Sequence, residues 1–162
     1  MAFPTKSSKV RRSSCPQSNN PPQKTAPLFW GVSLHMRKHR ILYVEDHEDT
    51  RDLVRLLLQQ RNYDVVTTDT IASALILADG GMFDLYLLDS RLPDGTGLEL
   101  CKQLRLLDDL TPIVFYSAAA YEVDRNTAFD SGAQGYLVKP TANGELTRMV
   151  SELINKHRDG SV

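Results

Sequence analysis

The 162-residue sequence has few cysteines and no long apolar run. Its two cysteines, Cys15 and Cys101, do not have the spacing of a zinc site or a redox pair. No stretch approaches the roughly 18 consecutive apolar residues that are needed to span a bilayer. These absences favour a reducing compartment and no membrane contact, so we expect a cytoplasmic protein.

Acidic residues are missing from the first part of the chain. Residues 1–40 contain eight of the 19 basic residues and no acid, so 11 basic residues and all 20 acids fall in residues 41–162, a balance of -9. Residues 1–38 are also rich in Ser, Pro, Asn and Gln and lack apolar periodicity, which predicts a disordered basic tail. This leaves a folded domain at 39–158 and a short C-terminal tail at 159–162.

Three alternatives to a solvated N-terminal tail stay open. The polar residues that follow Arg11 and Arg12 exclude a twin-arginine export signal, because no apolar core comes next. An organelle transit peptide, a tail that touches nucleic acid, and translation that starts at Met36 are all compatible with the composition.

From residue 40 onward, short apolar runs alternate with longer helical patterns. Strands are predicted at 41–44, 64–68, 83–88, 112–117 and 134–138, and helices at 50–60, 71–78, 98–107, 121–131 and 143–156. The strands are continuous apolar runs, which is typical of a parallel sheet buried on both faces. We therefore predict the α/β class, with a doubly wound five-stranded parallel sheet and helices on both faces.

Polar side chains stand at the end of four of the predicted strands or directly after them. Glu45 and Asp46 end the first strand, Asp89 the third and Ser117 the fourth, and Lys139 follows the fifth. In open doubly wound sheets, ligands bind beyond the carboxyl ends of the strands. Clustered carboxylates favour a hard cation such as Mg²⁺, and a lysine supplies a positive charge for a phosphate oxygen. The set predicts phosphoryl chemistry on the central aspartate.

The acids that follow the pair at 45 and 46 have a different interpretation. Glu48 and Asp49 lie at the start of a predicted helix, where acidic side chains favour the helix dipole. His47 is predicted to be an exposed loop residue. The four acids therefore divide into a candidate cation site and a helix start.

In chain order, these motifs resemble the receiver domain of response regulators in two-component signalling. The resemblance covers residues 40–157 and rests on the acid pair, on LLDSRLPDGTGLEL around Asp89, and on Ser117, Tyr136 and Lys139-Pro140. It implies a flavodoxin-like fold with strand order 2-1-3-4-5, an order that the periodicity alone does not give.

The resemblance also implies a phosphoacceptor and a metal site. Asp89 would take a phosphoryl group from a histidine kinase or from a histidine phosphotransfer protein. Mg²⁺ would be held by Asp46 and Asp89, by the backbone carbonyl of Arg91, and by Glu45 through water. Beyond this self-catalysed phosphotransfer and autodephosphorylation, no enzymatic activity is expected.

Further residues receive roles only through the resemblance. Lys139 would pair with the phosphoryl group, Ser117 would hydrogen-bond to it, and a cis peptide bond is expected before Pro140. Ser117 and Tyr136 would act as the switch. They would shift the equilibrium between two conformations of the face formed by the fourth helix, the fifth strand and the last helix. This face is the expected output surface.

Output is expected to pass through another protein, because the chain ends soon after the last predicted helix. A downstream protein target and a homodimer are compatible with this, and nucleic acid is an unlikely partner. A relay shuttle and a receiver fragment of a hybrid histidine kinase stay open, as does a receiver-like module that is never phosphorylated. A phosphohydrolase is disfavoured because Arg91 stands where a second acid is needed.

Overall fold

The computed structural model describes residues 37–142 and 144–160. Apart from Arg37 and Lys38, the predicted N-terminal tail lies outside the described residues, and so do its alternatives. Within the described ranges, no helix has the length and apolar character that crossing a membrane requires.

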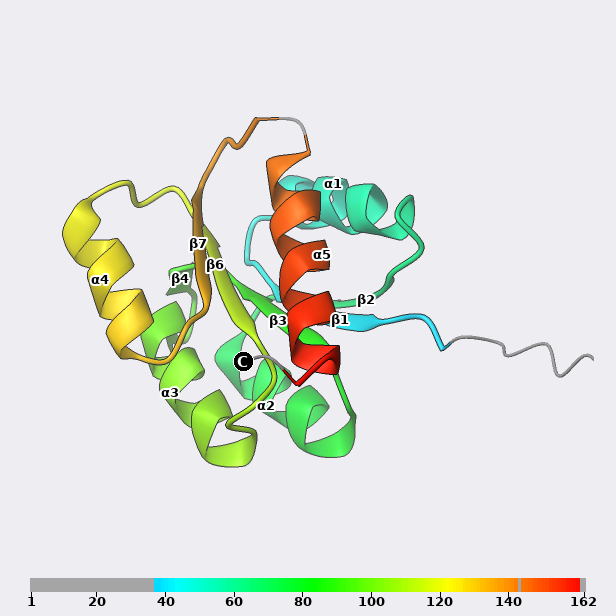
Figure 1. The fold of residues 1–162 in the computed structure, drawn as a ribbon. Helices are drawn as coiled ribbons and strands as arrows, with labels where there is room; N and C mark the ends of the chain where they lie inside the picture. Colours follow the sequence, from blue (N-terminus) through cyan, green and yellow to red (C-terminus); the bar gives the residue numbers. More distant parts are fainter. Residues whose placement is uncertain (1–36, 143, 161–162) are drawn as a thin grey trace, which may run out of the picture. The chain divides into compact units, whose positions relative to one another are not determined.

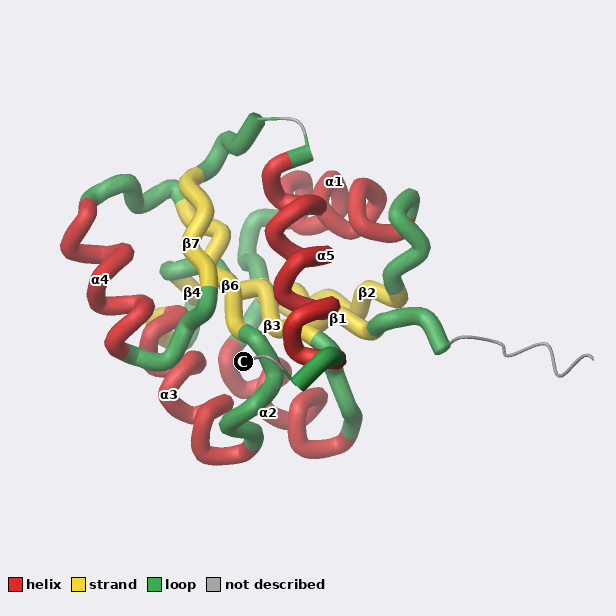
Figure 2. The backbone as a smooth tube through the Cα atoms, viewed as in Figure 1, coloured by secondary structure: helices red, strands yellow, loops and turns green. Residues whose placement is uncertain are grey.

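Five parallel strands form one sheet, seen side by side in the middle of Figure 2. The strands are β1 (Arg40–Val44), β2 (Asp64–Thr68), β3 (Leu85–Leu88), β6 (Ile113–Ser117) and β7 (Gly135–Val138). Their order in the sheet is β2-β1-β3-β6-β7, which confirms the expected order 2-1-3-4-5 of the five. Val44 pairs with Thr68 on one side and with Leu88 on the other, so the carboxyl ends of these three strands meet at one edge.

Five helices cover the two faces of the sheet, as Figure 1 shows. They are α1 (Glu48–Gln59), α2 (Ile71–Gly80), α3 (Gly97–Leu107), α4 (Glu122–Asp130) and α5 (Glu145–Arg158). Side chains alternate between faces along each strand. In β1, Ile41 and Tyr43 therefore join the core beneath α1 and α5, whereas Leu42 and Val44 join the core beneath α2 and α3. The predicted fold class is confirmed.

The helix and strand boundaries differ from the predicted ones by at most two residues. The exception is the segment between the third predicted strand and the third predicted helix, which carries no predicted element. It contains a small antiparallel ribbon of β4 (Arg91–Leu92) and β5 (Gly95–Thr96). The ribbon is too short to give an apolar period, so the sequence pattern does not reveal it.

Candidate functional site

The acid pair closes the central strand of the sheet. Glu45 is 2% exposed, and its N–H continues the sheet ladder by donating to the carbonyl of Thr68 at 3.0 Å. Asp46, the next residue, is exposed. The guanidinium of Arg51 donates to the carbonyl oxygens of Glu45 and Asp46, at 2.8 and 3.3 Å, and so fixes the turn that presents both acids.

The two acids further along the chain belong to the helix. α1 begins at Glu48, and both Glu48 and Asp49 lie in its first turn. His47 is the N-terminal cap residue and is exposed, although its side chain makes no capping hydrogen bond. The predicted helix start at Glu48 and Asp49 is therefore confirmed, and these two acids are separate from the pair that follows β1.

Asp89 lies one residue beyond β3 and is 9% exposed. Its N–H donates to the carbonyl of Val44 at 2.9 Å, so the residue remains in register with the central strand. The start of α3 packs tightly against it: a Cβ atom on Gly97 would lie 2.0 Å from the Asp89 carbonyl oxygen. A side chain at position 97 would therefore displace Asp89.

Carboxylate oxygens of Glu45, Asp46 and Asp89 lie within 4.8 Å of one another. Two oxygens bound to opposite sides of one Mg²⁺ are about 4.2 Å apart, because each bond is about 2.1 Å long. The observed spacing suits a cation that two carboxylates bind directly and the third binds through water. The donor set is entirely oxygen, and clustered carboxylates of like charge need such compensation. The three residues fit Mg²⁺.

Lys139 reaches this group from the loop after β7. Its Nζ lies 3.2 Å from Asp89 Oδ1, contacts Glu45 Oε2, and stands 5.3 Å above the ring of Tyr116. The peptide bond between Lys139 and Pro140 is cis. We call Glu45, Asp46, Asp89 and Lys139 the carboxyl-end cluster; its three acids and one ammonium give it a net negative charge.

Tyr43 is a contact of the cluster that the sequence reasoning missed. Its hydroxyl donates to Glu45 Oε2 at 2.7 Å. Burial raises the pKa of Tyr43, and the nearby charge of Glu45 raises it further, so the hydroxyl remains a proton donor. Residues i and i+2 of a strand lie on the same face, which places Tyr43 beside Glu45 but does not distinguish this contact from an ordinary core tyrosine.

The two predicted switch residues hold the loop that follows β6. Ser117 is buried, and its Oγ accepts a hydrogen bond from the Ala119 N–H at 3.2 Å. Tyr136 is 4% exposed; its ring stacks on Phe115 at a centroid distance of 5.9 Å, and its hydroxyl donates to the Ala119 carbonyl at 2.9 Å. Both residues therefore meet at Ala119.

The predicted site residues line one cleft at the carboxyl edge of the sheet. The cleft is lined by Glu45, Asp46, Asp89, Arg91, Ser117, Tyr136 and Lys139, among other residues. Pro140 is not among its lining residues. Positions that are 94 residues apart in the chain are thus in contact, as Lys139 and Glu45 are.

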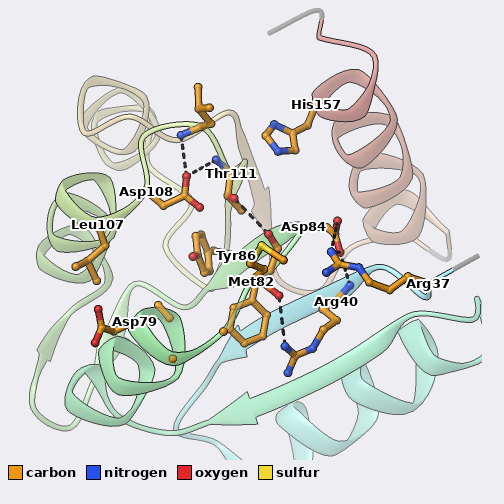
Figure 3. Close-up of a pocket in the computed structure, with 15 residues that line it drawn as sticks. Arg37, Arg40, Asp79, Met82, Asp84, Tyr86, Leu107, Asp108, Thr111 and His157 are labelled. Atoms are coloured by element: carbon orange, nitrogen blue, oxygen red, sulfur yellow. Dashed lines mark hydrogen bonds and ion pairs between the residues drawn. The ribbon is translucent and has the colours of Figure 1, made fainter.

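A second hollow lies at the opposite, amino edge of the sheet (Figure 3). Asp84 lies there in a set of paired charges, the amino-end network, which comprises Arg37, His39, Arg40, Asp64 and Asp84. Asp84 accepts from the Arg40 N–H at 2.7 Å and from the Arg37 guanidinium at 3.2 Å, and His39 Nδ1 is 3.4 Å away. Burial raises the pKa of Asp84, but the hydrogen bond from the Arg40 N–H, the nearby His39 ring and the charge of Arg37 lower it more, so the pKa lies below its usual range. Arg40 also pairs with Asp64 at 3.1 Å.

Comparison with known proteins gives a consistent result. The family model described as the response regulator receiver domain matches residues 41–151. A probable transcriptional regulatory protein of Picosynechococcus sp. is 34% identical over 75% of this chain and 51% of its own length. The non-phosphorylated HemR receiver domain from Leptospira biflexa has a TM-score of 0.68 at 34% identity, covering 72% of this chain and 94% of that one.

A third similar structure holds a metal ion. The receiver domain of the sensor histidine kinase PA1611 from Pseudomonas aeruginosa was crystallised with a magnesium ion coordinated in its active site cleft. It has a TM-score of 0.68 at 28% identity, covering 73% of this chain and 98% of that one.

The chain spans about half the length of the curated relatives it matches. Several of those relatives are described as transcriptional regulatory proteins. The expectation that nucleic acid is an unlikely partner is therefore not supported.

Proposed function

The chain belongs to the response regulator receiver domain family, and we propose that it is a phosphoacceptor in a two-component or phosphorelay pathway. One observation supports this above the others. Asp89 is buried beside two further carboxylates and 3.2 Å from the Lys139 ammonium. The cleft thus brings together a nucleophile, an oxygen ligand set for a cation, and a positive charge that is able to bind a phosphoryl oxygen.

In the proposed reaction, an Asp89 carboxylate oxygen attacks the phosphorus of a phosphohistidine on a histidine kinase or a histidine phosphotransfer protein. The P–N bond breaks as the new P–O bond forms, and the imidazole leaves. Such transfer depends mainly on positioning and on charge neutralisation. Lys139 supplies one neutralising charge when it moves from the carboxylates to the phosphoryl group.

The proposed metal ligands are Asp46 and Asp89 directly, the backbone carbonyl of Arg91, and Glu45 through water. Bound Mg²⁺ would neutralise the charge that gathers on the phosphoryl oxygens during transfer. Arg91 begins the β4 strand and lines the same cleft as the three acids. The magnesium ion in the PA1611 receiver supports this assignment.

The proposed output surface is the face formed by α4, β7 and α5. A phosphoryl group adds about -1.5 to -2 charges and three strong acceptors. Ser117 would leave Ala119 to donate to one of these oxygens, and that movement would reach α4 through the loop that Tyr136 also holds. Tyr121 and Val123, at the start of α4, are 78% and 67% exposed and offer apolar contact to a downstream protein or a second copy.

Three further proposals complete this function. Beyond phosphotransfer and autodephosphorylation the described domain catalyses no reaction, and it acts in the cytoplasm. The output is linked to DNA or passes through another protein, because relatives about twice as long are described as transcriptional regulatory proteins.

A small-molecule phosphodonor with Mg²⁺ tests the phosphoacceptor proposal. We expect the intact chain to gain the mass of one phosphoryl group, and the Asp89→Asn variant to gain none. Asp84→Asn, which alters a partly buried aspartate of the amino-end network, is the matched control and should gain mass as the wild type does. A gain that survives in Asp89→Asn, or no gain in the wild type, would refute the proposal and favour an interaction module that is never phosphorylated.

A further inference from the structure

Tyr43 is not among the residues that the family resemblance assigns to the site, yet it bonds directly to one of them. The side chain is 0% exposed and lies in the core beneath α1 and α5. Its hydroxyl oxygen is 2.7 Å from Glu45 Oε2. A buried hydroxyl is a neutral donor, so this hydrogen bond does not depend on the position of any mobile charge.

Glu45 requires such a fixed donor. Its side chain is 3% exposed, and a buried carboxylate without a partner is costly. Tyr43 and Lys139 both contact Oε2, whereas among residues 37–142 and 144–160 Oε1 receives only a 3.4 Å contact from the His47 N–H. That contact is long for a hydrogen bond. Oε1 is therefore the oxygen with capacity left for a water molecule on a cation.

Lys139 is not able to be the permanent partner of Glu45. The same ammonium lies 3.2 Å from Asp89 Oδ1 and serves both carboxylates at once. In the proposed phosphotransfer it moves to the phosphoryl group. Without a second donor, Glu45 would either lose its partner at that moment or hold the ammonium back.

We propose that Tyr43 is a positioning residue, which holds the Glu45 carboxylate by Oε2 so that Oε1 serves a hydrated divalent cation while Lys139 is free to leave. The cation part of this inference stands on the geometry of the cluster. The part about Lys139 rests on the proposed function.

Titration of the full chain with Mg²⁺, followed by calorimetry, tests the cation part. Tyr43→Phe removes only the hydroxyl, and we expect the dissociation constant for Mg²⁺ to rise about tenfold, as for other residues that orient a metal ligand. Tyr86→Phe is the matched control, because Tyr86 is a buried tyrosine of the neighbouring strand β3 that lines the amino-edge hollow of Figure 3. It should bind Mg²⁺ as the wild type does.

A double-mutant cycle separates positioning from general support of the fold. If Tyr43 acts through Glu45, then Tyr43→Phe will cause no further loss of Mg²⁺ affinity in a Glu45→Gln background. Wild-type affinity in Tyr43→Phe, or an equal loss in both backgrounds, overturns the inference.

Lys139→Met gives a second test that does not depend on folding of the Tyr43 variant. With Tyr43 as the holder of Glu45, this variant should bind Mg²⁺ at least as tightly as the wild type, because a competing positive charge is gone. Weaker binding would make Lys139 the holder and overturn the inference. If the wild type binds Mg²⁺ but takes no phosphoryl group, the proposed function fails and the titrations still decide the role of Tyr43.

Discussion

At the amino edge of the sheet, Asp84 is surrounded by donors, whereas at the carboxyl edge Asp89 shares the Lys139 ammonium with Glu45 and lies beside a third acid, Asp46. Asp84 has the Arg40 N–H, the Arg37 guanidinium and the His39 ring within 3.4 Å. In the carboxyl-end cluster, the Lys139 ammonium contacts Glu45 and Asp89. Within the described residues, the Asp46 carboxylate has no hydrogen bond or ion pair.

The difference separates charge that holds the fold from charge that awaits a ligand. A paired carboxylate stabilises the folded state by itself, because its bonds are complete without any added ion. A cluster of like charges costs free energy until a cation neutralises it. The charges at the amino edge of the sheet thus stabilise the fold by pairing with one another, whereas those at the carboxyl edge need a bound cation to be neutralised.

Gly97→Ala is the substitution with the largest expected effect on this comparison. The new Cβ would lie 2.0 Å from the Asp89 carbonyl oxygen, which is backbone and has no room to rotate away. We expect a loss of about 3 kcal/mol or more in the free energy of unfolding, as for severe overpacking. Urea denaturation measures it.

Gly80→Ala is the matched control for that change. Gly80 is the last residue of α2, near the amino edge, and a Cβ there meets no atom within 4 Å. Alanine is favoured over glycine in helices, so we expect no loss and a gain of up to about 1 kcal/mol. Equal losses in both variants would show that the close packing at Asp89 is not what matters.

Added Mg²⁺ should stabilise the protein through the carboxyl-end cluster alone. At a concentration of 100 times the dissociation constant, a ligand that binds only the folded state adds about 2.7 kcal/mol. We expect this gain in the wild type and in Asp84→Asn, and its loss in Asp89→Asn. Unfolding with and without EDTA measures it, and an undiminished gain in Asp89→Asn would place the cation elsewhere.

Asp84→Asn removes the charge at the centre of the amino-end network. We expect it to lower the free energy of unfolding by about 2 kcal/mol at neutral pH, the usual contribution of hydrogen bonds to a charged group. The pKa of Asp84 is lowered in the folded state, so its stabilisation is present above pH 3.8 and is lost as the pH falls further. The difference between wild type and variant should therefore shrink below that pH. Asp52→Asn, which breaks an exposed ion pair with Arg55, is the control and should cost less than 1 kcal/mol.

The carboxyl edge was predictable from the sequence and the amino edge was not. Glu45, Asp89 and Ser117 each follow an apolar run directly, and the carboxyl ends of parallel strands meet at one edge. The partners of Asp84 carry no such mark. Arg37 lies just before β1 and Arg40 begins it, 47 and 44 residues before Asp84 in the chain. Nothing in the spacing shows which acid each arginine pairs with.

Two finer features of the site needed the structure. The Tyr43 hydroxyl bonds to Glu45, and a strand tyrosine in an apolar run is equally compatible with an ordinary core residue. Arg51 holds the carbonyl oxygens of the acid pair from one turn into α1, a contact made to the backbone, which sequence patterns do not specify.

The smallest expected effects come from two acids that are two residues apart. Asp46→Asn removes one of three carboxylates within 4.8 Å, and each like charge at that distance costs about 1 kcal/mol in water. Lys139 offsets part of this cost, so without divalent cations we expect the free energy of unfolding of the variant to be higher by about 1 kcal/mol.

Glu48→Gln removes a negative charge that interacts favourably with the α1 dipole. We therefore expect the free energy of unfolding of this variant to fall by about 0.5 kcal/mol.

Opposite signs for these two substitutions, measured by urea denaturation in EDTA, would confirm that the strand boundary divides the acids by role. A loss of stability in both variants would mean that Asp46 supports the helix start as Glu48 does. Saturating Mg²⁺ sharpens the contrast, because it should reverse the sign for Asp46→Asn and leave the Glu48→Gln loss unchanged. Reversal of the sign of the stability change distinguishes a carboxylate that stabilises the protein only with a bound cation from one that stabilises the fold without it.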